Sequence, residues 1–92
     1  MNDSFAYPVP KLASLPVSMP PEGAVRIELV EGVPLFRASK VVQEKIERLL
    51  AKQRQRKLNA EETKELDLYE EMDDYLSFLN RLVRNLILKQ RD

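Results

Sequence analysis

The sequence predicts a mainly α fold: an antiparallel helical hairpin with a long second helix, preceded by a short β-strand or β-hairpin and a Pro-rich extended arm. Three observations indicate this fold. All six prolines lie within the first 34 residues, apolar and charged residues alternate from Val25 to Leu29, and no Gly or Pro occurs after Pro34. The chain therefore divides at about residues 23 and 37 into an arm, a β-ribbon and a helical part.

Residues 1–23 form the predicted arm. Five prolines occur before residue 22, and proline both fixes φ and removes a backbone donor, which excludes a regular helix or a central strand. We therefore expect an extended or disordered segment. Apolar side chains that could anchor it in a groove are spread along it: Phe5, Tyr7, Val9, Leu12, Leu15, Val17 and Met19.

Residues 24–37 are predicted to form a β-ribbon. The alternation of Val25, Ile27 and Leu29 with Arg26 and Glu28 is typical of a half-buried strand. A turn at residues 31–32 and a return strand at an edge would follow, because proline at position 34 cannot sit in a central strand. A lone two-stranded ribbon is marginally stable. We expect it to pack on helices, to pair with a second copy, or to join a partner's sheet.

Residues 38–92 are predicted to form the helical hairpin, with helices at about 40–56 and 60–90. Ser39 and Asn59 are suitable N-caps, and Glu62 stands three residues after Asn59 as in a capping box. Residues 38–59 hold seven basic and two acidic side chains, whereas residues 60–77 hold one and eight. Folding back would place these opposite charges side by side.

The second predicted helix outreaches the first. At about 1.5 Å per residue the helices would span roughly 25 and 46 Å, so the second extends beyond its neighbour from about residue 76. Beyond that point its apolar side chains cover about half of the helix circumference, whereas a surface helix normally has an apolar stripe about 100° wide. This surface therefore needs a cover: the ribbon and arm of the same chain, a second copy, or a different protein. The predicted partner-binding residues are Leu76, Leu79, Leu82, Val83, Leu86 and Ile87, with Arg81 and Arg84 at the rim.

The composition argues against most catalytic chemistry. The chain has no Cys and no His, which excludes disulfides, thiolate nucleophiles and the side chain best suited to proton transfer near neutral pH. We predict no catalytic residue, no cofactor and no metal site. One acidic pattern, Glu44 and Glu47 with Glu71 and Asp74, resembles the magnesium site of all-α nucleoside triphosphate pyrophosphatases. Helical geometry turns these carboxylates away from the shared apolar face, so a magnesium-dependent nucleotide hydrolase is the last alternative.

A nucleic-acid partner is the nearer alternative. A strand followed by two helices resembles ribbon-helix-helix DNA binders, so a dimeric DNA-binding autoregulator is the alternative function, although Glu28 would face phosphate. The basic residues at 52, 54, 56 and 57 are followed at once by acidic ones.

The start "MNDSFAYPVPKLASLP" lacks the positive and apolar regions of a signal peptide, and no run approaches the roughly 20 apolar residues of a membrane span. We expect a cytoplasmic protein with no membrane partner.

The stretch "LLAKQRQRKLNAEETKELDLYEEMDDYLSFLNRLVRN", residues 49–85, is similar to a set of small bacterial proteins encoded beside nuclease-type toxins and regarded as antitoxins. The similarity rests on Leu49, Leu50, Lys52, Gln53, Leu58, Glu61, Glu62, Glu65 and Leu66. It departs from the commoner form at residues 56–57, where a Gly usually helps the turn. The resemblance implies a non-enzymatic neutraliser that binds a protein partner, with a nuclease-type toxin as the candidate. The apolar surface of the second helix and the small core also favour a homo-oligomer.

Overall fold

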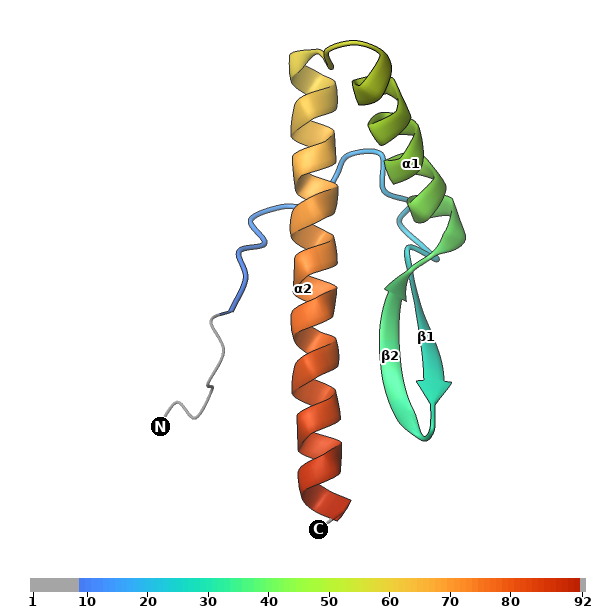
Figure 1. Ribbon diagram of the computed structural model, residues 1–92, viewed down its shortest axis with the longest axis vertical. Helices are drawn as coiled ribbons and strands as arrows, with labels where there is room; N and C mark the ends of the chain where they lie inside the picture. Colours follow the sequence, from blue (N-terminus) through green and yellow to red (C-terminus); the bar gives the residue numbers. More distant parts are fainter. Residues whose placement is uncertain (1–8, 92) are drawn as a thin grey trace.

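The computed structural model describes residues 9–91 and contains two strands followed by two helices (Figure 1). Their bounds are β1 (Val25–Val30), β2 (Val33–Ala38), α1 (Lys40–Gln55) and α2 (Ala60–Arg91). The molecule is elongated, with extents of 51 × 29 × 24 Å, because α2 runs along its whole length (Figure 1).

The helices begin at the capping residues that the sequence predicts. Ser39 Oγ accepts a hydrogen bond from the Val42 N–H at 3.3 Å. At the start of α2, Asn59 Oδ1 accepts from the Glu62 N–H at 2.8 Å, and Glu62 Oε1 accepts from the Asn59 N–H at 3.0 Å. This reciprocal pair is a capping box, and it satisfies two donors that a helix start otherwise leaves without partners.

The two strands form an antiparallel hairpin closed by a two-residue turn. Val30 pairs with Val33, and the register runs through Ile27 opposite Phe36 to Val25 opposite Ala38. The turn residues Glu31 and Gly32 both have positive φ, 54° and 83°. Two such residues are typical of the turn whose twist matches that of paired strands.

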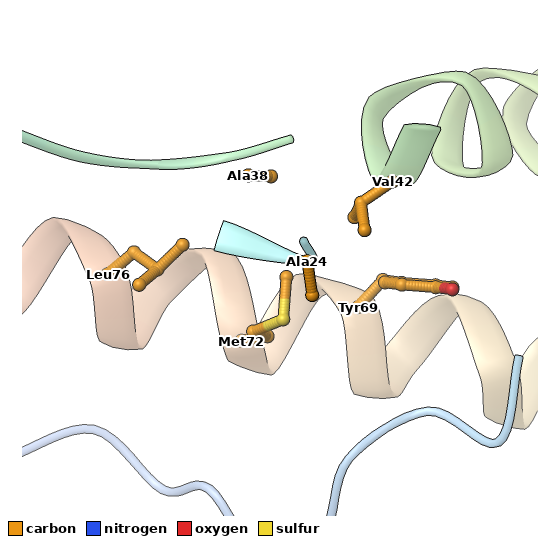
Figure 2. Packing of buried hydrophobic residues seen from close by; sticks show 6 residues of the cluster. All are labelled: Ala24, Ala38, Val42, Tyr69, Met72 and Leu76. Atoms are coloured by element: carbon orange, nitrogen blue, oxygen red, sulfur yellow. The ribbon is translucent and has the colours of Figure 1, made fainter. Parts of the chain in front are cut away.

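The core lies where the open end of the hairpin meets the start of α1 and the middle of α2. Its members are Ala24, Ala38, Val42, Tyr69, Met72 and Leu76 (Figure 2). Val42 and Tyr69 are fully buried. The core is small, and the helices contribute only part of it.

The prediction of a mainly α fold organised by an antiparallel helical hairpin with a long second helix is wrong. The fold is mixed: a two-stranded hairpin is followed by two helices, and α2 packs more extensively against β2 than against α1. The helices are close at their connection and then diverge (Figure 1). The physical reason is that the base of the β-hairpin takes part in the contact between the helices. Ala24 and Ala38 pack there with Val42 of α1 and Tyr69 of α2, in the place where a helical hairpin would have direct contacts between its two helices.

The described part of the arm, residues 9–23, lies against the helices. Leu12 and Met19 pack on the core cluster, and Pro16 is buried. Ser18 Oγ lies 2.8 Å from the Tyr69 hydroxyl and also donates to the Glu65 carboxylate. Two of the expected anchors, Phe5 and Tyr7, lie outside the described residues.

The apolar side of β1 is exposed, which differs from the expected half-buried strand. Ile27 is 63% exposed and Leu29 is 73% exposed. The hairpin approaches α2 through β2, so β1 lies on the far side (Figure 1). Alternation therefore correctly indicated a strand, but no element of the described chain covers its apolar face.

Candidate protein-binding surface

A pair of hydrogen bonds holds the hairpin beside the second half of α2. Asn80 Oδ1 accepts from the Phe36 N–H at 2.7 Å, and Asn80 Nδ2 donates to the Phe36 C=O at 3.0 Å. The carboxamide thus bonds to the outer edge of β2 as a neighbouring strand would. This contact brings residues 30–35 of the hairpin alongside the C-terminal part of α2.

The first two predicted anchor residues belong to the protein's own core. Leu76 is 9% exposed and is a member of the core cluster, and Leu79 packs against it. Neither is free for a partner in this conformation. The intramolecular cover that the sequence left open is therefore partly realised, since the hairpin and the arm both contribute to the same core.

The remaining apolar residues of the C-terminal half are incompletely covered. Leu82, Val83 and Ile87 are half-buried, and Leu86 is 53% exposed. At about 100° per residue, Val83 and Ile87 lie within about 60° of Asn80, on the hairpin side of the helix. By the same geometry Leu82 and Leu86 lie on one flank of that line, and Arg81 and Arg84 lie on the other.

The arginine flank borders a groove between α2 and the tip of the hairpin. The groove has a volume of about 420 Å³. Hairpin residues Val30, Glu31, Val33 and Leu35 line one wall, and α2 residues Asn80, Arg81, Arg84 and Leu88 line the other. The hairpin wall was absent from the predicted site, because nothing in the sequence indicates that residue 36 lies beside residue 80. Leu88, 45% exposed, is not among the predicted residues, because at about 100° per residue it lies outside the arc of the helix that they occupy.

The carboxylates of the alternative magnesium site do not converge. Among residues 9–91, no group of three or more acidic side chains is placed to hold a metal ion. Glu44, Glu47 and Asp74 are exposed, whereas Glu71 is half-buried with one oxygen lacking a hydrogen-bond partner. The pattern that suggested a hydrolase is therefore not assembled in this structure.

The charged residues considered for DNA contact are partly engaged within the chain. Lys52 pairs with Glu62 across the helix connection. The Lys52 ammonium, and after it the Asn59 N–H, lower the pKa of the Glu62 carboxyl. On the strand, the Glu28 carboxylate lies 3.0 Å from both the Arg26 and the Arg37 guanidinium.

Across the described chain, no helix is long and apolar enough to cross a bilayer.

Comparison with protein-family models, with curated proteins and with solved structures gives no match for this chain. The case for a function therefore rests on the residues of the site.

Proposed function

We propose that this protein is a non-enzymatic protein-interaction module that binds a partner protein through the C-terminal half of α2. The binding surface comprises the half-buried and exposed apolar residues Leu82, Val83, Leu86, Ile87 and Leu88, with the groove formed against the hairpin. Leu76 and Leu79 support this surface from the core beneath it. The location of this activity is proposed to be the cytoplasm.

The observation that carries the proposal is the unequal cover along α2. Its first half packs against the arm, the hairpin base and α1, whereas Leu86 and Leu88 are 53% and 45% exposed. Leu86 and Leu88 lie on opposite flanks of the half-buried Val83 and Ile87. An apolar surface that spans several side chains on a small protein indicates an interaction site more often than an isolated side chain does. The exposed arginine Arg84 at the groove suits a partner with an acidic rim, because opposite charges steer association and fix orientation.

The similarity of residues 49–85 to antitoxin-like proteins supports a particular partner class. A nuclease-type toxin bound at this surface would be blocked sterically, without a chemical step carried out by this chain. In such a mechanism the module acts by occupying the toxin, and its potency depends on the stability of the complex.

The test is affinity capture with matched surface variants, followed by binding measurements on the purified partner. Leu86→Lys and Leu88→Lys place a charge on opposite flanks of the surface. Both positions are near a helix C-terminus, where a positive charge is tolerated. Val17→Lys changes an equally apolar residue that is 98% exposed and distant in sequence. We expect the wild type and Val17→Lys to bind one partner in stoichiometric amount, and at least one of the helix variants to lose it.

Circular dichroism checks that all three variants fold as the wild type does. If the captured protein cleaves RNA or DNA, adding this protein in equimolar amount should inhibit the cleavage. Equal capture by all variants, or a partner that binds only in trace amount, would show that the C-terminal surface is not the binding site.

A further inference from the structure

The two edges of the β-hairpin differ in how they are protected. On the outer edge of β2, Asn80 bonds both main-chain groups of Phe36, and Gln43 Nε2 donates to the Ala38 C=O at 2.8 Å. Pro34 has no N–H to offer. This edge is therefore poorly suited to a further strand, because both Phe36 groups and the Ala38 C=O are already bonded and Pro34 lacks a donor.

The outer edge of β1 is open. The Phe36 main-chain groups point toward Asn80, so Phe36 does not exchange hydrogen bonds with Ile27, its opposite residue. In an antiparallel pair such positions alternate with bonded ones. The N–H and C=O groups of Val25, Ile27 and Leu29 therefore point away from β2, and within residues 9–91 no group bonds to them. Their side chains are 41%, 63% and 73% exposed.

The charges on β1 select a self-pairing register. Two antiparallel copies can meet at this edge only if outward-pointing residues face one another. The registers that pair at least two of these three residues have their centre of symmetry at residue 26, 27 or 28. A centre at Arg26 places two arginines opposite each other, and a centre at Glu28 does the same with two glutamates. A centre at Ile27 places Arg26 opposite Glu28 of the partner subunit, twice by symmetry. Opposite charges across a strand pair stabilise it, and like charges destabilise it.

The same register also aligns the apolar residues. Val25 would stand opposite the partner's Leu29, and Ile27 opposite the partner's Ile27. All three outward-facing residues then exchange main-chain hydrogen bonds with the second copy. No other register gives hydrogen-bond partners to as many of the outward-pointing main-chain groups of β1.

We propose that β1 is a homodimerisation edge: two copies pair their β1 strands antiparallel about Ile27 and form a four-stranded sheet in the order β2-β1-β1-β2. This surface is separate from the C-terminal surface of α2. The α2 helices flank the two ends of the sheet, since each lies against its own β2.

Cysteine cross-linking tests the register directly. The chain contains no Cys, so a single introduced thiol can pair only with its copy. We compare Arg26→Cys, Ile27→Cys and Glu28→Cys under mild oxidation. Opposite residues in a bonded antiparallel pair have Cα atoms about 5.5 Å apart, within disulfide range. We expect a cross-linked dimer from Ile27→Cys in at least fivefold excess over the other two; equal or absent cross-linking from Ile27→Cys overturns the register.

Charge exchange tests the dimer without relying on thiols. In Arg26→Glu, the new carboxylate faces the partner's Glu28 but still lies opposite Arg37 within its own hairpin, so the hairpin is retained. We expect at least a tenfold rise in the dimer dissociation constant by analytical ultracentrifugation. The double variant Arg26→Glu/Glu28→Arg restores the opposite charges and should return the constant to within about threefold of wild type.

Two further results decide the proposal. Leu86→Lys should leave the dimer unchanged, which separates this edge from the proposed partner surface. A wild-type chain that remains monomeric up to several hundred micromolar, or a double variant that dimerises no better than Arg26→Glu, overturns the proposal; a strand of a different protein would then be the candidate for the open edge.

Discussion

The Asn80 side chain hydrogen-bonds both main-chain groups of Phe36, 44 residues away in sequence. A carboxamide carries a donor and an acceptor in the geometry of a peptide group, so it can occupy the place of an adjacent strand. One side chain thus occupies the edge of β2 at Phe36 and positions the hairpin on α2. The groove beside α2 depends on this contact.

Replacing Asn80 should therefore destabilise the fold. Asn80→Ala removes both bonds and leaves the part-buried Phe36 groups without partners, which is expected to lower the free energy of unfolding by about 1–3 kcal/mol. Urea denaturation measures this, and Ser77→Ala, an exposed change on the same helix, is the control. Amide exchange at Phe36 should accelerate in Asn80→Ala. An unchanged rate there would show that Asn80 does not hold the strand.

The turn of the hairpin offers a stabilising and a destabilising change. Glu31 has φ of 54° and Gly32 has φ of 83°, a region that costs most L-residues about 1–2 kcal/mol. Asn adopts it more readily, so Glu31→Asn should stabilise the protein by about 0.5–1 kcal/mol. Gly32→Ala should destabilise it by about 1–2 kcal/mol. Thermal melts of the two variants should move in opposite directions; movement in the same direction contradicts this account of the turn.

The capping box predicts a specific acid dependence. The Lys52 ammonium and the Asn59 N–H lower the pKa of Glu62 below its ordinary value of 4.5. A carboxyl with a lowered folded pKa contributes stability that is present above pH 4.5 and is lost as the pH falls through the folded value. The stability difference between wild type and Glu62→Gln should therefore shrink below about pH 4.5. Glu61→Gln is the neighbouring control, and a difference that stays constant down to pH 2 would exclude this linkage.

The Tyr69 hydroxyl should hold the arm in place. Tyr69 is fully buried, and its hydroxyl lies 2.8 Å from Ser18 Oγ. Tyr69→Phe keeps the packing and removes this bond, at an expected cost of about 0.5–1.5 kcal/mol. Tryptic cleavage after the exposed residue Lys11 should become faster, whereas cleavage after Lys57, in the connection between the helices, should not. Equal acceleration at both sites would indicate general unfolding instead.

Local signals in the sequence identified the helix caps and the hairpin turn. Ser39 and Asn59 act as the expected caps, because capping depends on residues within one turn. Glu31-Gly32 forms the expected turn for the same reason. These interactions join residues no more than three positions apart, so their residue types alone carry the information.

The arrangement of the elements depended on contacts that local patterns do not specify. Alternation showed that β1 has an apolar face but could not show whether anything covers it, and Ile27 is exposed. Asn80 reads as an ordinary polar helix residue, although it fixes the hairpin. Leu76 was correctly identified as apolar and in need of cover, yet the cover comes from its own chain. The exposure of Ile27, the role of Asn80 and the burial of Leu76 all depend on which distant segments lie side by side. The periodicity of apolar residues within one segment does not specify this.

The Asn80 contact also divides α2 into two regions of different lability. All the core residues of this helix precede residue 80, so its last three turns can fray without exposing Tyr69 or Met72. Fraying of this kind would give a degradative protease an unfolded segment to cleave at low energetic cost. A bound partner would suppress it, and the lifetime of the protein in a cell would then report how much of it is occupied.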